Sequence, residues 1–288
     1  MCLMTKKYSI CGKVISFDTP PISTDLGDMN LFEYEGSETD ITVTCHIAEN
    51  LPDFPEIRKD LGNGVFVSWQ GKDIYRYTPM GVYEGSLSRS NFSESSFSDV
   101  YFTNRSFKTF FHYRYLWNSV SLSQLLLPFK ILLLHASYIS YNGKAILFSA
   151  PCGTGKSTQA ELWRRHKGAE VINGDKAGVS VESNGAIAHG LPFSGTSGIC
   201  KNRSMPLGAI VLLGQAPENK IRRLNGAEAL TGIMKNVYLD FAAPEETERC
   251  VDTIIELLKS VPVYKLDCTP DSGAVETLYK ELGIRSEE

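Results

Sequence analysis

The chain has 288 residues, of which 42% are hydrophobic and 22% are charged, and its formal net charge is −4. These values are typical of a globular protein with one large domain or two modest ones, and the negative charge does not favour nucleic acid or an anionic membrane as a partner. The seven cysteines are scattered without a C-x-x-C pair, and neither an export signal nor a membrane-spanning apolar run is evident, so we expect reduced thiols and a cytoplasmic protein.

Residues 1–112 are predicted to form a β-rich region, a candidate for binding a substrate or a partner. Segments that alternate apolar and polar residues between Pro, Gly, Asn or Asp are typical of strands. Such segments lie at 8–17, 40–47, 64–69, 74–77 and 100–103. The serine-rich segment 85–98 predicts a loop. His46 and His112 have no second ligand at a useful spacing, which favours packed or exposed histidines over metal ligands.

Residues 113–288 are predicted to form a second, α/β domain. A helical spacing over 119–127 ends at a proline, and Asn142-Gly143 then favours a type I′ turn between two strands. In such a hairpin Tyr141 pairs with Lys144, and the same register continued places His135 opposite Ala150. A histidine there can contact a phosphoryl group or a nucleophile, or it can be a structural residue at a strand end; we favour the functional role.

A glycine-rich stretch follows this hairpin. Residues 149–158 read Ser-Ala-Pro-Cys-Gly-Thr-Gly-Lys-Ser-Thr and lie between an apolar strand and a helical segment. This order is typical of a loop that binds nucleotide phosphates, although Ala150 replaces the first glycine of the G-x-x-x-x-G-K-[ST] pattern. Lys156 can reach the β- and γ-phosphates, and the Ser157 hydroxyl can hold Mg²⁺. The predicted nucleotide-binding residues are Pro151, Cys152, Gly153, Thr154, Gly155, Lys156, Ser157 and Thr158.

The next strand brings a carboxylate towards this loop. A helix over 157–167 ends in a basic turn, which is typical of a helix end and not of a nucleic-acid patch. A strand over 169–172 then runs into Asn-Gly-Asp-Lys, so the Asp175 carboxylate should lie near the phosphates. It can hold Mg²⁺ there or accept a proton from an attacking hydroxyl. The alternative is a purely structural role, in which Asp175 only forms a turn with Gly174.

The remaining segments complete the α/β domain. A hairpin over 179–189 leads to the small-residue loop 190–198, which is suited to closing over a substrate or nucleotide. Lys201 and Arg203 either supply positive charge to a phosphoryl group or are exposed surface charges. Strands are expected at 207–213 and 263–267, and helices at 228–239, at 245–258 and in the last segment up to Leu282.

Three motifs together resemble the HPr kinase/phosphorylase and phosphoenolpyruvate carboxykinase group. They are His135-Ala136, the loop from Ala150 to Ser157 and Asn173-Gly-Asp-Lys176. The resemblance covers roughly residues 130–275 and is greatest to HPr-kinase-like proteins of peptide-modification and uncharacterised bacterial clusters. It implies a phosphoenolpyruvate carboxykinase-like mixed sheet that carries the phosphate loop (a P-loop), in addition to the β-rich N-terminal region.

The resemblance also implies roles for single residues. His135 matches the catalytic histidine of the family, Lys156 and Ser157 match its loop residues, and Asp175 matches the second of two adjacent catalytic aspartates, one of which binds metal. Together with the loop pattern, this predicts His135, Lys156 and Asp175 as catalytic residues and Ser157 and Asp175 as metal ligands. Gly174 stands where the first of two adjacent aspartates would be. Phosphorylase activity and the HPr substrate are therefore not carried over to this chain.

These observations predict an ATP- and Mg²⁺-dependent kinase that transfers the γ-phosphate to a hydroxyl, with a serine of a peptide or protein as the first choice of acceptor. A small-molecule hydroxyl is the second choice. The main alternative is a non-catalytic ATP-responsive binding module, and carboxykinase chemistry on oxaloacetate ranks last. Either His135 or Asp175 would receive the hydroxyl proton. The sequence leaves the oligomeric state open, a homo-oligomer included.

Overall fold

The structure is a computed structural model that describes residues 3–21, 27–80, 83–91, 96–110 and 119–283. The chain divides into two compact units. The first unit comprises Met1–Phe129 and Leu239–Arg249, and the second comprises Lys130–Tyr238 and Cys250–Glu288. Each unit contains one mixed sheet, so the predicted mixed α/β fold with a β-rich N-terminal region is confirmed. No helix among the described residues is long and apolar enough to cross a membrane.

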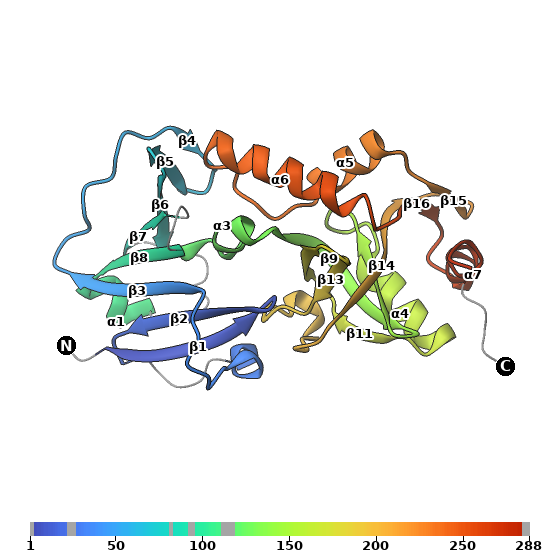
Figure 1. Ribbon diagram of the computed structural model, residues 1–288, viewed down its shortest axis with the longest axis horizontal. Helices are drawn as coiled ribbons and strands as arrows, with labels where there is room; N and C mark the ends of the chain where they lie inside the picture. Colours follow the sequence, from blue (N-terminus) through green and yellow to red (C-terminus); the bar gives the residue numbers. More distant parts are fainter. Residues whose placement is uncertain (1–2, 22–26, 81–82, 92–95, 111–118, 284–288) are drawn as a thin grey trace. The chain divides into compact units, whose positions relative to one another are not determined.

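The first unit is built on a sheet with the strand order β1-β2-β3-β8-β7-β6-β5-β4 (Figure 1). The strand bounds are β1 Met4–Ile10, β2 Lys13–Thr19, β3 Ile41–Ala48, β4 Lys59–Asp60, β5 Phe66–Gln70, β6 Asp73–Met80, β7 Tyr83–Asn91 and β8 Ser96–Thr103. The strand β3 runs parallel to both β2 and β8, whereas the other neighbours are antiparallel. The helical elements are η1 Gly27–Phe32, α1 Asn104–Phe110, α3 Leu122–Leu126 and η2 Leu127–Phe129.

The prediction of a loop over the serine-rich segment 85–98 is wrong, because the segment supplies most of β7 and the start of β8. Four described serines of the segment, Ser86, Ser88, Ser90 and Ser98, are buried. Ser86 Oγ lies 2.5 Å from Ser119 Oγ, and Ser90 Oγ donates to Ser98 Oγ at 2.9 Å. Hydroxyl pairs of this kind stabilise neighbouring strands without the apolar alternation on which the sequence prediction relied.

The structure describes one of the two histidines that the sequence analysis considered in this region. His46 Nε2 lies 2.8 Å from Asp99 Oδ1, and its ring stacks on Tyr101. It is thus a packed histidine, as predicted. His112 lies outside the described residues.

The first unit extends beyond the predicted domain. The predicted boundary at 112/113 lies outside the described residues, but 119–129 and 239–249 belong to the first unit rather than to the second. The later segment is held there because Lys59 Nζ donates to the carbonyl oxygens of Asp240 and Phe241 at 3.1 and 2.8 Å. Such long-range contacts leave no local mark in a sequence.

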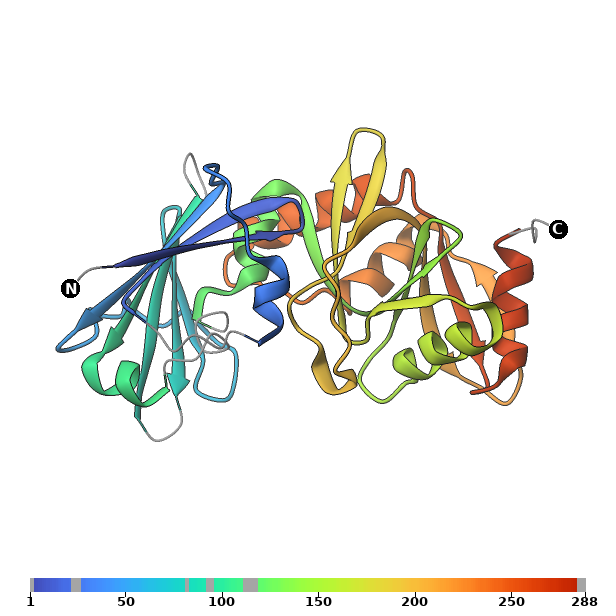
Figure 2. The same ribbon diagram turned by 90° about the horizontal axis from the view of Figure 1, so that it is seen from below.

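The second unit is built on strands β9 to β16. Their bounds are β9 Ile131–Tyr141, β10 Lys144–Ser149, β11 Glu170–Asn173, β12 Lys176–Glu182, β13 Gly185–His189, β14 Ser204–Gln215, β15 Lys220–Arg223 and β16 Val263–Cys268. The first half of β9 pairs with β12, and its second half pairs with β10 and β11. Likewise β14 starts against β13 and continues parallel to β10 and β16. The β12–β13 hairpin is yellow in Figure 2.

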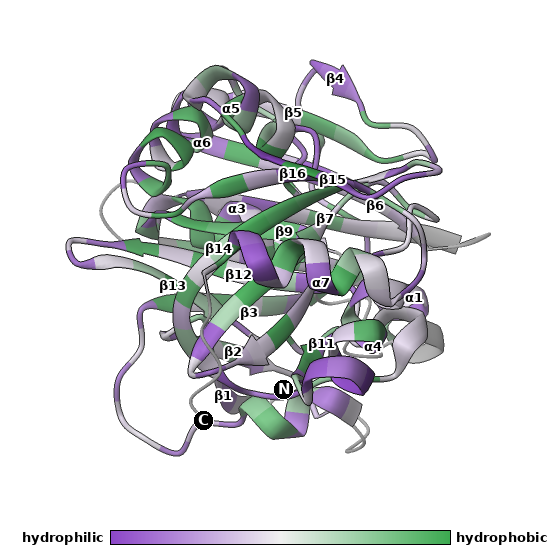
Figure 3. Ribbon diagram, turned by 90° about the vertical axis from the view of Figure 1, so that its right-hand side faces the viewer, coloured by the Kyte–Doolittle hydropathy of each residue, from purple (hydrophilic) through white to green (hydrophobic). Residues whose placement is uncertain are grey.

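Helices cover both faces of this sheet (Figures 1 and 3). The helical elements are α4 Lys156–Lys167, η3 Gly195–Ser197, α5 Gly226–Met234, α6 Pro244–Leu257, which starts in the first unit, and α7 Ser272–Glu281. On the face covered by α4 and α7, Trp163 and Leu278 pack with Phe148 of β10 in one hydrophobic cluster. Trp163 is fully buried, and burying a side chain of that size contributes on the order of 3 kcal/mol. This cluster fixes α4 on the strand that precedes the glycine-rich loop.

The predicted hairpin before that loop is confirmed. Tyr141 pairs with Lys144, and the register continues to Ala136 opposite Ser149. Asn142 and Gly143 have φ values of 46° and 70°, as a type I′ turn requires. Contrary to the prediction, the register does not reach His135 and Ala150, because β10 ends at Ser149 and the N–H of His135 donates instead to the carbonyl oxygen of Asn236 at 2.9 Å. On its other edge, β9 pairs His135 with Lys176 of β12.

Candidate functional site

The glycine-rich loop connects the end of β10 to the start of α4. Gly153 and Gly155 have φ values of 78° and 110°, in the left-handed region that favours glycine. A Cβ atom on either glycine would meet no atom within 4 Å, so the space beside the loop is open. The first N–H groups of α4 have no partner within the helix, which makes this end suited to an anion. Of the predicted loop residues, Pro151, Cys152, Gly153, Ser157 and Thr158 are exposed.

Lys156 is folded back along the loop. Its Nζ donates to the carbonyl oxygens of Ala150 at 2.9 Å and of Pro151 at 3.2 Å, and the residue is 7% exposed. Burial lowers the pKa of Lys156 because it removes water from the ammonium group. The structure also explains why position 150 is alanine, because the Ala150 methyl group belongs to the hydrophobic cluster around Trp163. An alanine therefore replaces glycine here by packing into the core.

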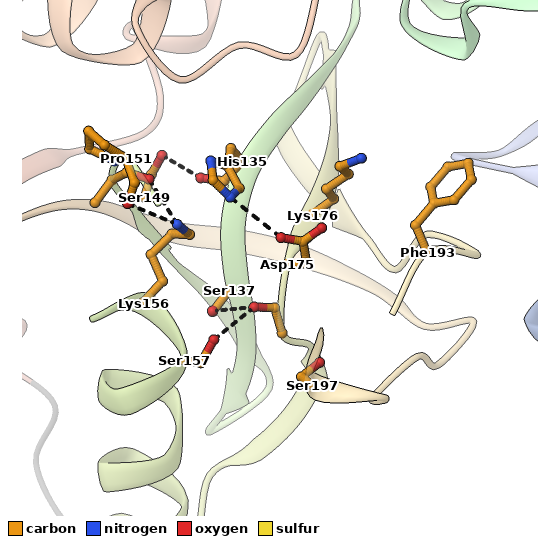
Figure 4. Close-up of polar contacts among 12 residues, drawn as sticks. His135, Ser137, Ser149, Pro151, Lys156, Ser157, Asp175, Lys176, Phe193 and Ser197 are labelled. Atoms are coloured by element: carbon orange, nitrogen blue, oxygen red, sulfur yellow. Dashed lines mark hydrogen bonds and ion pairs between the residues drawn. The ribbon is translucent and has the colours of Figure 1, made fainter. Parts of the chain in front are cut away.

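Two serine hydroxyls, one from β9 and one from α4, hold the turn that carries Asp175 (Figure 4). The carbonyl oxygen of Gly174 accepts from Ser137 Oγ at 2.8 Å and from Ser157 Oγ at 3.2 Å. Because Ser157 donates its proton in this contact, the lone pairs of its oxygen remain available to a cation. The predicted proximity of the turn to the loop is thus observed.

His135 and Asp175 face each other next to Lys156 (Figure 4). His135 Nε2 lies 3.4 Å from Asp175 Oδ1, and each side chain is about one-third exposed, at 30% and 31%. The backbone N–H of Ala136 donates to the carbonyl oxygen of Asp175 at 3.0 Å, which fixes the two strands at this point. Burial, followed by the charge of Lys156, lowers the pKa of His135 despite the opposite effect of Asp175. The imidazole is therefore neutral at neutral pH and able to accept a proton.

Asn173 holds the turn and a neighbouring loop together, a role that the sequence prediction missed. Its Oδ1 accepts from the backbone N–H groups of Asp175 and Lys176 at 2.9 and 3.0 Å. Its Nδ2 donates to the carbonyl oxygens of Leu191 and Phe193, each at 3.0 Å. The signal for the first contacts was present, since an asparagine before Gly-Asp is typical of an Asx turn. The contacts to the distant loop have no local signal.

The small-residue loop 190–198 packs against Gly174 and Asp175. A Cβ atom on Gly174 would lie 2.3 Å from Ser197 Oγ, and one on Gly195 would lie 2.6 Å from the Cβ of Asp175. Ser197 Oγ in turn donates to the carbonyl oxygen of Ser194 at 2.7 Å. Ser197 thus occupies the space that a side chain at position 174 would need.

Three cations of this region are held in different ways. Lys176, which the sequence prediction left without a role, lies with its Nζ 4.0 Å from the ring centroid of Tyr238, and its charge contributes to lowering the pKa of His135. Lys201 and Arg203 both bind Glu170 at the start of β11. For those two residues the structure agrees with the surface alternative, because they pair at the end of β11 remote from Asn173.

Comparison with known proteins gives one family and a weak structural likeness. A family model described as "SynChlorMet cassette protein ScmC" matches residues 120–278. No curated protein shows significant similarity to the chain. A similar solved structure is described as "Structure of the Hpr(Ser) kinase/phosphatase from Coxiella burnetii"; it is 14% identical, and the match covers 52% of this chain and 94% of that chain with a TM-score of 0.31.

A TM-score of this size does not establish a shared fold, so the phosphoenolpyruvate carboxykinase-like fold stays a prediction. The family match, in contrast, includes the hairpin, the glycine-rich loop, the turn with Asp175 and most of α7. Because it spans more than half of the 288 residues, the chain belongs to the family of the SynChlorMet cassette protein ScmC.

Proposed function

We propose that the chain is an ATP- and Mg²⁺-dependent phosphotransferase that moves the γ-phosphate to a hydroxyl, with a serine of a peptide or protein as acceptor. The observation that carries the proposal is the convergence of Lys156, Ser157, His135 and Asp175 at the start of α4. These side chains come from α4, from β9 and from the turn before β12. They supply a cation, a hydroxyl, a neutral base and a carboxylate next to the glycine-rich loop.

The residues present fit a nucleotide with Mg²⁺. The open space beside Gly153 and Gly155 gives phosphate oxygens access to the backbone of the loop. Mg²⁺ bound with a nucleotide commonly uses one or two protein oxygens beside phosphate and water, and Ser157 Oγ and an Asp175 oxygen can serve as these ligands. The described residues contain no group of three or more His, Cys, Asp or Glu that could hold a metal ion by itself. When bound, MgATP supplies the phosphoryl group and neutralises part of its charge.

The side chains divide the chemical work. His135, kept neutral by burial and by Lys156, accepts the proton of the acceptor hydroxyl. The acceptor oxygen then bonds to the γ-phosphorus while the bond from the γ-phosphorus to the β,γ-bridging oxygen breaks, and ADP leaves. Asp175, at 3.4 Å, stabilises the resulting imidazolium or takes the proton itself. Lys156 stabilises negative charge on the transferring group once phosphate oxygens replace its contacts with the loop carbonyls.

A binding and transfer assay tests the proposal. We expect the full chain to bind a fluorescent ATP analogue with Mg²⁺ and to transfer label from [γ-³²P]ATP to a pool of serine-containing peptides. Lys156→Ala should lose both activities. Lys144→Ala, at the exposed far end of β10, is the matched control and should keep both. Nucleotide binding that is equal in wild type and Lys156→Ala would refute the site, and binding without transfer in any peptide or metabolite pool would favour the ATP-responsive module.

A further inference from the structure

A groove of about 620 Å³ adjoins the start of the phosphate loop. One side is formed by Ala150 and Pro151, and the other side by α5. Leu212 and Leu224 contribute apolar surface to its lining. The volume falls within the range of sites that bind small molecules or short peptide segments. We refer to it as the α5 groove.

The position of Lys156 indicates which end of a nucleotide this groove adjoins. A lysine at this place of a phosphate loop reaches the β- and γ-phosphates. Its Nζ contacts the carbonyl oxygens of Ala150 and Pro151, and both residues line the α5 groove. The groove therefore opens at the γ-phosphate end of the loop, where an acceptor hydroxyl has to approach.

The charges along the groove favour an acidic occupant. Arg222 is held by Glu228 through contacts of 2.9 and 2.8 Å, and Lys265 lies 3.2 Å from Asp267. Lys235, at the end of α5, is exposed, and the described residues provide no hydrogen-bond or ion-pair partner for its ammonium group. The lining thus has one positive charge left over, and this charge suits a carboxylate on the bound molecule.

We propose that the α5 groove is the acceptor site and that it takes a peptide segment whose serine or threonine has an aspartate or glutamate nearby, with that carboxylate bound by Lys235. This inference rests on the proposed function, because it assumes that a γ-phosphate is presented at Ala150 and Pro151. It adds the location of the acceptor and the chemical character of its flanking residues.

The test uses two peptide pools with a central serine, one with aspartate and glutamate at the flanking positions and one with lysine and arginine. Transfer from [γ-³²P]ATP and binding of fluorescein-labelled peptides are measured with the full chain. Wild type should prefer the acidic pool in both assays, and Lys235→Glu should reduce that preference by about fivefold, the effect of one exposed ion pair. Lys259→Glu, an exposed lysine just after α6 that does not line the groove, should leave the preference unchanged.

A second variant and a nucleotide assay separate the possible failures. Thr231→Trp places a large side chain from α5 in the groove and should weaken peptide binding while the affinity for a fluorescent ATP analogue stays within twofold. Weaker nucleotide binding with unchanged peptide preference would show that the groove holds the nucleoside and would overturn the inference, but not the proposed function. Equal binding of both pools would overturn it as well. If the wild type did not bind the ATP analogue at all, the proposed function would be refuted.

Discussion

Replacement of Gly174 should destabilise the second unit even though the new side chain is small. A Cβ atom at this position would lie 2.3 Å from Ser197 Oγ and 2.5 Å from its Cβ, closer than such atoms approach. Either the turn with Asp175 or the η3 segment must then move. Overpacking of this kind costs about 1–3 kcal/mol, so Gly174→Ala should lower the free energy of unfolding by that amount. Gly174→Asp introduces the aspartate that the HPr kinase/phosphorylase group has at this position. It should lose phosphoryl transfer because the larger side chain displaces Asp175.

Substitutions of Ser197 should rescue the stability lost at Gly174 and provide a control for that rescue. Ser197→Gly removes both clashing atoms, and the double variant should recover most of the stability lost in Gly174→Ala. Ser197→Ala keeps the Cβ at 2.5 Å and should rescue only in part. We expect a coupling energy of about 1–3 kcal/mol from a double-mutant cycle in urea denaturation followed by circular dichroism. An additive cycle, or wild-type stability of Gly174→Ala, would refute the claim that Ser197 is what requires glycine.

Three further predictions concern other side chains of the second unit. Burial lowers the pKa of His189 from 6.5 to about 4, so between these pH values the unfolded chain binds a proton that the folded chain does not. At 1.36 kcal/mol per unit of pKa, the wild type should lose about 3 kcal/mol more unfolding free energy than His189→Gln does when denaturation is compared at pH 7 and pH 4. Asn173→Ala removes four hydrogen bonds of a fully buried amide and should cost about 3 kcal/mol in the same assay, with loss of transfer; an unaltered midpoint would contradict its clamping role. Iodoacetamide should alkylate the exposed Cys152, and MgATP should slow the reaction in wild type but not in Lys156→Ala, as followed by mass spectrometry; protection in neither protein would place the nucleotide elsewhere, and protection in both would show that binding does not need Lys156.

Local patterns sufficed to predict the structure around the glycine-rich loop. The Asn142-Gly143 turn fixed the hairpin register, and Gly-Lys-Ser between a strand and a helix predicted the loop. The expectation that Asp175 would lie close by followed from chain order alone. Each of these features depends on residues that are near one another in the sequence, which is the range over which sequence patterns are informative.

Features that depend on distant residues were missed or predicted wrongly. His135 does not pair with Ala150 because its N–H donates to the carbonyl oxygen of Asn236, which is distant in the sequence. The buried Ser86 and Ser90 of β7 pair with Ser119 and with Ser98 of β8, which an apolar pattern cannot reveal. Ser197 fills the place opposite Gly174 from 23 residues further along the chain.

The alanine at the first position of the glycine-rich loop has a consequence for the flexibility of that loop. Because the Ala150 methyl group is part of the cluster around Trp163, that end of the loop cannot move without opening the hydrophobic core. This end is therefore rigid before any ligand arrives, and ordering it on binding costs little conformational entropy. The loop 190–198, which packs against Gly174 and Asp175, is held as well, because Asn173 fastens it by two amide hydrogen bonds.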